Sequence, residues 1–245
     1  MPLKKGDFIL LDYTARVKET GEVFDTTMEE EAKKAGLSKQ GALYGPSLTV
    51  VGEGWVLKGL DENLVNLELE KQVEVEVPPE KGFGSRDPSK MRLVPLRRFR
   101  TQKIAPYPGL RVEVDGRPAV VRAVGAGRVQ VDFNPPLAGK TLVYSVSLRK
   151  ILESGEDRIR ALVHRRFVMD ETKFGLKLED KRVTVEIPEE ALYLEGLQFS
   201  KRGLANDIHR FFPDVESVAF VEVFKRKPEA PAEEQKEQGP VQQGS

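Results

Sequence analysis

Alternation of apolar and polar residues predicts strands in the first third of the chain. The run Phe8–Val17 is a strand candidate, and turn residues at 19–22 lead it into a second strand at Val23–Asp25. Between Val73 and Val77, valines alternate with glutamates, which is the two-residue period of a strand with one buried face, and Pro78–Pro79 ends it. We therefore expect a hairpin that ends at a carboxylate, and later a half-buried strand.

Short helical patterns lie between these strands. Residues 28–35 have helical composition and are followed by Gly36, which predicts a short surface helix before a strand at 48–51. Leu60, Leu64 and Leu67 recur at helical spacing, which predicts a short helix with one apolar face after Gly59.

Residues 86–138 differ in pattern from both flanks. Apolar residues alternate with polar ones at 112–114 and at 129–133, and Asp115–Gly116 and Gly125–Gly127 supply turns. We expect a small all-β insert. It holds eleven Lys and Arg against four Asp and Glu, a net charge of +7, so the rest of this neutral chain carries −7. The positive charge suits acidic clients, and it equally suits a solvated surface.

The last third alternates between helical and strand patterns. After a return strand through Leu148, we expect helices at 156–167 and 196–212 and strands at 182–187 and 218–224, which together make an α+β module. From residue 228 the sequence lacks aromatic and large aliphatic residues apart from Val241, which predicts a disordered tail.

Composition excludes several kinds of chemistry. There is no cysteine, and the two histidines, His164 and His209, lack ligand spacing, so we expect no disulfide, no metal site and no cofactor. No nucleophile elbow or catalytic triad signature occurs. Without a leader-like apolar segment or a membrane span, the expected location is the cytoplasm. The balanced overall charge gives no strong attraction to nucleic acid or to a membrane.

Four apolar clusters suggest the lining of one small pocket with a single carboxylate. They are Tyr13 with Phe24–Asp25, the run Gly54–Leu60, the pair Phe83–Gly84, and Leu142–Val146. In their order and spacing they resemble the FKBP-type peptidyl-prolyl isomerases, and most closely the branch typified by SlyD and the long archaeal members. In that branch a second domain interrupts the catalytic one before its last strand.

The resemblance covers residues 1 to about 152 and implies an α+β fold with an antiparallel half-barrel wrapped on a short helix. It implies an isomerase domain from residues 1–85 plus 139–152 and an inserted small all-β domain at 86–138. A C-terminal α+β domain at 153–226 and a tail at 227–245 follow.

The implied activity is rotation about X-Pro bonds, whose barrier is about 20 kcal/mol. An apolar pocket lowers this barrier by removing the water that stabilises the planar amide. The resemblance places these residues around the substrate proline: Tyr13, Phe24, Asp25, Val56, Leu57, Leu60, Phe83 and Tyr144. The alternative for each is an ordinary role in the core or in a turn.

Some positions depart from the family pattern. Leu60 stands where drug-binding members have a tryptophan, and Phe83 stands where many have a tyrosine, so the resemblance leaves macrolide binding open. The equivalent of another pocket aromatic falls near Ser47 or Leu48. Trp55 adjoins the pocket segment, and its side chain could point inward or outward.

The insert matches the chaperone domain of the SlyD-like branch, which implies binding of unfolded, proline-containing chains at a sheet edge and at apolar patches. Phe99, Pro106 and Pro108 are candidates for that face.

Two alternatives remain open. The protein could be a holdase with an incidental pocket, or the arginines on the 156–167 helix could dock it on a ribosome or nucleic acid. Because the same module carries many acidic residues and no nucleic-acid motif, we favour a solvated or intersubunit face for these arginines. We also hypothesise a homodimer through apolar residues of the last domain: Leu192, Leu194, Leu197, Phe199, Phe211 and Phe212.

Overall fold

The computed structural model describes residues 2–39, 42–167 and 169–224. They form a mixed α+β fold in which strands make three separate sheets and helices are few. Contacts divide the chain into two compact units, residues 1–169 and residues from 170 on. The predicted tail at 227–245 lies outside the described residues. Whether the expected boundaries delimit separate domains stays a prediction.

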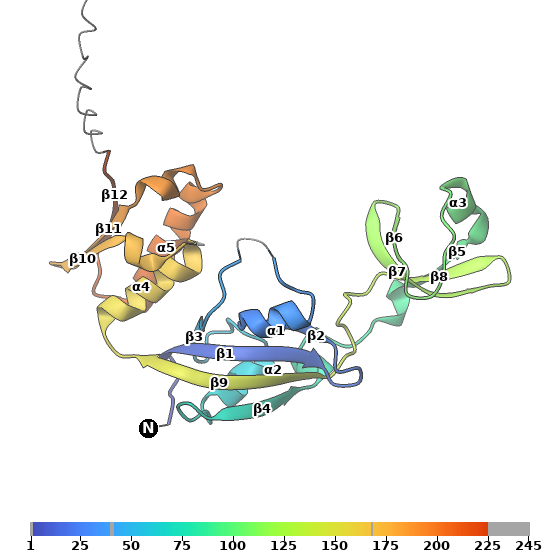
Figure 1. Cartoon of the computed structure of the whole chain (residues 1–245), viewed down its shortest axis with the longest axis horizontal. Helices are drawn as coiled ribbons and strands as arrows, with labels where there is room; N and C mark the ends of the chain where they lie inside the picture. Colours follow the sequence, from blue (N-terminus) through green and yellow to red (C-terminus); the bar gives the residue numbers. More distant parts are fainter. Residues whose placement is uncertain (1, 40–41, 168, 225–245) are drawn as a thin grey trace, which may run out of the picture. The chain divides into compact units, whose positions relative to one another are not determined.

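The first sheet joins strands from both sides of the insert. It contains β1 (Phe8–Val17), β2 (Val23–Thr26), β3 (Ser47–Val50), β4 (Gln72–Val77) and β9 (Leu142–Leu152). The order is β2-β1-β9-β4, with β3 also paired to β1, and every pairing is antiparallel. Figure 1 shows β1 and β9 as two long strands side by side. The strands expected from alternation are confirmed, and β1 has the predicted bounds.

Alternation gives this sheet one apolar and one polar face. Ala15 of β1 and Tyr144 and Val146 of β9 belong to one core cluster, and Tyr13 of β1 packs against it partly buried. Leu60 and Leu64 are fully buried in the same cluster. On the other face, charged residues pair across strands, as Arg16 of β1 does with Glu74 of β4. Burying one leucine contributes about 1.5–3 kcal/mol, so the helix is held mainly by packing on the sheet.

Two short helices accompany the first sheet. They are α1 (Glu29–Lys34) and α2 (Lys58–Leu64), and a 3-10 turn, η1 (Pro79–Lys81), follows β4. At Gly59 in α2 an added Cβ would lie 2.9 Å from Val77 Cγ1, so only glycine lets this helix approach β4 so closely.

The insert forms a sheet of its own. Its strands are β5 (Met91–Pro95), β6 (Arg111–Val114), β7 (Arg117–Gly125) and β8 (Arg128–Asp132), in the antiparallel order β5-β8-β7-β6. Two helical pieces, η2 (Pro88–Lys90) and α3 (Leu96–Thr101), accompany them, so the expectation of an all-β insert misses a helix. At six residues, α3 is too short to show helical periodicity.

Phe99 was expected on the surface of the insert, but its side chain is buried. It is on α3, 1% exposed, in the core of the insert with Val112, Val121 and Val131. The helix turns this ring inward because it supplies the largest apolar side chain available to cover the sheet. Pro108 is exposed and Pro106 is half-buried.

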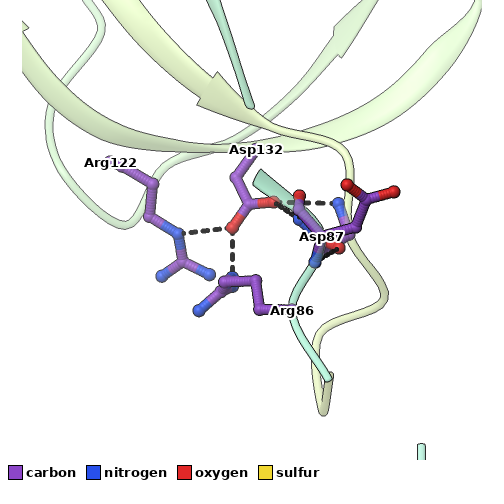
Figure 2. Close-up of polar contacts among 5 residues, drawn as sticks. Arg86, Asp87, Arg122 and Asp132 are labelled. Atoms are coloured by element: carbon purple, nitrogen blue, oxygen red, sulfur yellow. Dashed lines mark hydrogen bonds and ion pairs between the residues drawn. The ribbon is translucent and has the colours of Figure 1, made fainter. Parts of the chain in front are cut away.

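A buried carboxylate joins the two connectors between these sheets (Figure 2). Asp132, whose side chain is 1% exposed, accepts a hydrogen bond from Arg122 Nε at 3.0 Å and pairs with Arg86 Nη2 at 2.6 Å. Asn134 donates to Asp132 from its backbone N at 2.9 Å and from Nδ2 at 2.8 Å. Asn134 Oδ1 in turn accepts from the Asp87 backbone N at 2.9 Å. The segments that enter and leave the insert are therefore joined at one point by these hydrogen bonds and ion pairs.

Helix α4 (Gly155–Arg166) follows β9 and belongs to the first unit. Ser154 caps its N-terminus by accepting a hydrogen bond from the Asp157 backbone N at 3.0 Å. Ile159, Leu162 and Val163 form its buried face. The predicted helix at 156–167 is confirmed to within one residue.

The second unit is a three-stranded sheet with one long helix. It contains η3 (Glu171–Lys173), β10 (Gly175–Glu179), β11 (Arg182–Ile187), η4 (Glu189–Tyr193), α5 (Leu197–Phe211) and β12 (Ser217–Glu222). Strand β10 pairs antiparallel with β11, and β12 pairs parallel with it. The elements predicted at 182–187, 196–212 and 218–224 are confirmed to within two residues.

Of the residues proposed for dimerisation, Leu197 is buried, whereas Phe199 is 84% exposed. A homodimer stays a prediction. In the parts of the chain that the structure describes, every helix falls short of what a membrane span requires, and α5, the longest, has 15 residues.

We predict that Asp132→Ala destabilises the protein by about 2–3 kcal/mol, because two guanidinium groups lose their shared carboxylate. This loss of stability is smaller than the loss expected for a fully buried ion pair, because Arg86 and Arg122 are 30% and 38% exposed. Urea unfolding followed by circular dichroism measures the change. Glu113→Ala is the control, since that carboxylate is exposed on strand β6 and should matter little. Equal unfolding midpoints for Asp132→Ala and wild type would contradict the role of the network.

Candidate functional site

A pocket of about 370 Å³ lies over the apolar face of the first sheet and beside the start of α2. These residues line it: Tyr13, Asp25, Gly54, Trp55, Val56, Leu57, Leu60 and Tyr144. The structure thus brings six of the eight sequence-predicted site residues together around one hollow. Its walls are aromatic and aliphatic, and Asp25 supplies the carboxylate.

The strand register places the two tyrosines next to each other. Tyr144 of β9 lies opposite Ala15 of β1, and Tyr13 lies opposite Val146, so both rings project from the same face of neighbouring strands. Their centroids are 5.8 Å apart at an interplanar angle of 52°.

Two threonines hold the backbone of Tyr13 beside the end of β2. Thr27 Oγ1 accepts a hydrogen bond from Tyr13 N at 3.0 Å, and Thr26 Oγ1 donates to Tyr13 O at 2.9 Å. The predicted hairpin therefore brings Asp25 to the tyrosine, and the Tyr13 hydroxyl donates to Asp25 Oδ2 at 2.9 Å.

A loop before α2 forms the opposite wall. Asp61, in the first turn of the helix, accepts hydrogen bonds from Gly52 N at 2.9 Å and Gly54 N at 3.1 Å. Both glycines have positive φ angles of 75° and 67°, which other residues adopt only with strain. This folded loop positions Val56 and Leu57, which pack partly buried against the core.

Phe24 and Phe83 are not among the residues that line the pocket, although both were predicted for the site. Phe24 packs edge-on against Tyr144, with centroids 6.2 Å apart, and against Phe83, with centroids 6.4 Å apart. Phe83 is 42% exposed. The two rings extend the aromatic cluster outward from Tyr144 and so support its wall.

Both tyrosine hydroxyls are held in the protonated form. Burial, and then the negative charge and hydrogen bond of Asp25, raise the pKa of Tyr13 above its ordinary value. Burial, with a smaller contribution from Asp25, raises the pKa of Tyr144 to about 12. At neutral pH both phenols are therefore hydrogen-bond donors, and the Asp25 carboxylate is an acceptor within reach of Tyr13.

Trp55 lines the pocket, and this settles the choice left open by the sequence. Its ring also lies against the guanidinium of Arg165 in α4, at 3.9 Å from the ring centroid. In the sequence, only its position next to Val56 pointed to a place in the pocket wall. The contact with Arg165 could not be predicted, because no local pattern links residue 165 to residue 55.

Two further hollows adjoin the pocket. One, of about 280 Å³, shares Tyr13 with it and is lined by residues of the 43–48 segment and by His164 and Arg165. The other, of about 220 Å³, shares Asp25 with it and includes Tyr44. Tyr13 and Asp25 therefore each line the pocket and one neighbouring hollow.

Comparison with known proteins gives two family matches outside the pocket region. The family described as "FKBP26, IF domain" matches residues 92–137, and the family described as "FKBP26_C-terminal" matches residues 155–225.

Relatives cover the part of the chain that holds the pocket. A short-type peptidyl-prolyl cis-trans isomerase of Methanocaldococcus jannaschii is 34% identical over 149 residues, which cover 61% of this chain and 94% of that protein. An FKBP-type peptidyl-prolyl cis-trans isomerase SlyD of Treponema pallidum is 30% identical over 159 residues, or 63% of this chain and 81% of that protein.

The chain belongs to the FKBP-type peptidyl-prolyl cis-trans isomerases, as its sequence clusters predicted. It is an isomerase of X-Pro peptide bonds. The mixed α+β architecture with antiparallel sheets agrees with this family.

We predict that two of the five tyrosines ionise late in a spectrophotometric titration at 295 nm. Because the folded pKa values of Tyr13 and Tyr144 are raised, their contribution to stability is complete below the ordinary tyrosine pKa of about 10. It is lost as the pH rises through the folded values. The double variant Tyr13→Phe with Tyr144→Phe should remove only the late phase. Loss of the early phase instead would contradict the assignment.

Proposed function

We propose that the 370 Å³ pocket is where the X-Pro bond turns during protein folding. The observation that carries this proposal is one carboxylate, held by Tyr13 at 2.9 Å, at the rim of an otherwise apolar and aromatic hollow. No covalent step is needed. The walls exclude the water that stabilises the planar amide, so the twisted amide of the transition state is relatively favoured.

Each wall has a role in this mechanism. Leu60, from the start of α2, forms an apolar floor for the proline ring, and Val56 offers its backbone groups to the substrate. The protonated Tyr144 hydroxyl can donate a hydrogen bond to a substrate carbonyl. Asp25 favours the distorted amide through its charge. Phe24 and Phe83 act as supports for Tyr144.

We predict that Asp25→Asn lowers kcat/KM on a proline tetrapeptide about tenfold to a hundredfold, because a charged hydrogen-bonding group contributes about 1.5–3 kcal/mol. Tyr144→Phe should lower it less, by about threefold to fivefold, since one neutral hydrogen bond is lost. A protease-coupled isomerisation assay measures both. Glu22→Gln is the matched control, an exposed carboxylate in the same hairpin. Full activity in both pocket variants would reject the site.

The insert, on this proposal, binds unfolded chains before they reach the pocket. Strands β5 and β6 are the edges of its sheet, where an extended chain can add a strand. Leu93 on β5 is 59% exposed and Tyr107 is 60% exposed, and they offer apolar contacts that the buried Phe99 does not. Pro106 and Pro108 flank Tyr107. Tethering raises the local concentration of substrate near the pocket.

The connectors allow this role to be tested by deletion. Gly139 N donates to Gly84 O at 2.8 Å, so the chain enters and leaves the insert at adjacent points. A short loop can therefore replace residues 86–138 without stretching the first sheet.

We predict that the full chain accelerates proline-limited refolding of a protein at well below stoichiometric amounts. The deletion variant should keep its peptide activity and lose tenfold or more on the refolding protein, because only tethering is removed. Leu93→Ser with Tyr107→Ser should reproduce part of this loss. If the full chain prevents aggregation without accelerating refolding, it is a holdase and the catalytic proposal is wrong.

We place the proposed isomerase activity in the cytoplasm, where newly made chains fold.

A further inference from the structure

Helix α4 is fixed to the first sheet by its own first turns. Arg158 Nε donates a hydrogen bond to Leu152 O, the last residue of β9, at 2.8 Å. The same guanidinium lies 5.5 Å from the centroid of the Phe8 ring at the start of β1. Together with the buried face of the helix, these contacts determine where its last turn lies.

That last turn reaches the wall of the pocket. The Arg165 guanidinium lies 3.9 Å from the centroid of the Trp55 ring, well within the range of about 6 Å for a cation–π contact. Trp55 is half-buried and lines the pocket with Val56 and Leu57. The arginine therefore covers part of the indole and restricts its rotamers, while the indole still contributes to the pocket surface.

The same turn also borders the adjoining hollow. His164 and Arg165 line this 280 Å³ depression together with Tyr13, and Tyr13 lines the prolyl pocket as well. A chain with its proline in the first pocket can pass Tyr13 and place a neighbouring residue in the second. The last turn of α4 thus forms one wall of the hollow that a residue next to the substrate proline would enter.

We propose that Trp55 contacts the substrate residue adjacent to the proline, and that Arg165 is the positioning residue that holds Trp55 in place for it. The inference rests on the proposed function of the pocket. In this proposal α4 takes part in substrate binding. Loss of the contact between Arg165 and Trp55 should therefore raise KM and leave the rate of the chemical step unchanged.

The chain has a single tryptophan, so its fluorescence reports on Trp55 alone. In the full chain, Arg165→Ala should lower the anisotropy of Trp55 and at least halve the emission change on adding a saturating proline tetrapeptide. It should also raise KM about threefold to tenfold with kcat within twofold of wild type. Arg165→Lys keeps the cation and should restore part of both effects. Trp55→Phe should raise KM similarly.

Arg160→Ala is the matched control, because this arginine is on the same helix and pairs with Glu156 at 2.7 Å. It should leave KM and fluorescence unchanged. Wild-type KM in both Arg165→Ala and Trp55→Phe would overturn the inference, and so would an equal KM increase in Arg160→Ala. Circular dichroism checks folding, and the Arg165→Lys variant decides the question if Arg165→Ala unfolds.

The Asp25→Asn variant separates the two levels of the proposal. If it lowers kcat/KM while Arg165→Ala and Trp55→Phe have no effect, the pocket stands and only the role of α4 is wrong. If Asp25→Asn and Tyr144→Phe also have no effect, the proposed site itself is wrong.

Discussion

The structure depends on the pairing of β9 with both β1 and β4. Strand β9 is the last strand of the first sheet and lies at its centre, yet the chain reaches it only after the insert. The sheet can therefore close only if the two connectors run side by side, as the hydrogen bond from Gly139 to Gly84 shows. The Asp132 network ties the same connectors a few residues further on.

This pairing also creates the pocket. Tyr144 comes from β9 and Tyr13 from β1, so their ring contact exists only when the two strands are in register. The Asp25 hairpin and the loop tied by Asp61 then close two further sides. An insertion between β4 and β9 is tolerated because it enters and leaves at one point and carries its own core.

Much of the fold could be predicted because alternation and helical spacing are strong signals in β1, β4, α2 and α5. The helix α3 was missed because its few residues show no periodicity. Strand β10 was missed because Asp180 and Lys181 turn the chain with φ angles of 44° and 63°, without the glycine that usually marks such a turn.

The site could be predicted in part for a similar reason. Clusters in the sequence indicated which residues face the pocket, and six of them do. Phe24 and Phe83 belong to the surrounding aromatic cluster, and Phe99 is buried in the insert, because local sequence does not reveal which face of a loop or short helix is covered. The contact of Arg165 with Trp55 joins distant segments and has no local signal.

We propose that an X-Pro bond of the substrate rotates in the pocket over the first sheet. The most direct measurement is a two-dimensional NMR titration with a proline tetrapeptide, combined with exchange spectroscopy of the peptide. We expect exchange peaks between cis and trans peptide whose intensity grows with protein concentration, and amide chemical-shift changes that centre on Tyr13, Val56 and Tyr144. Exchange without shifts at these residues, or shifts confined to the insert, would contradict it.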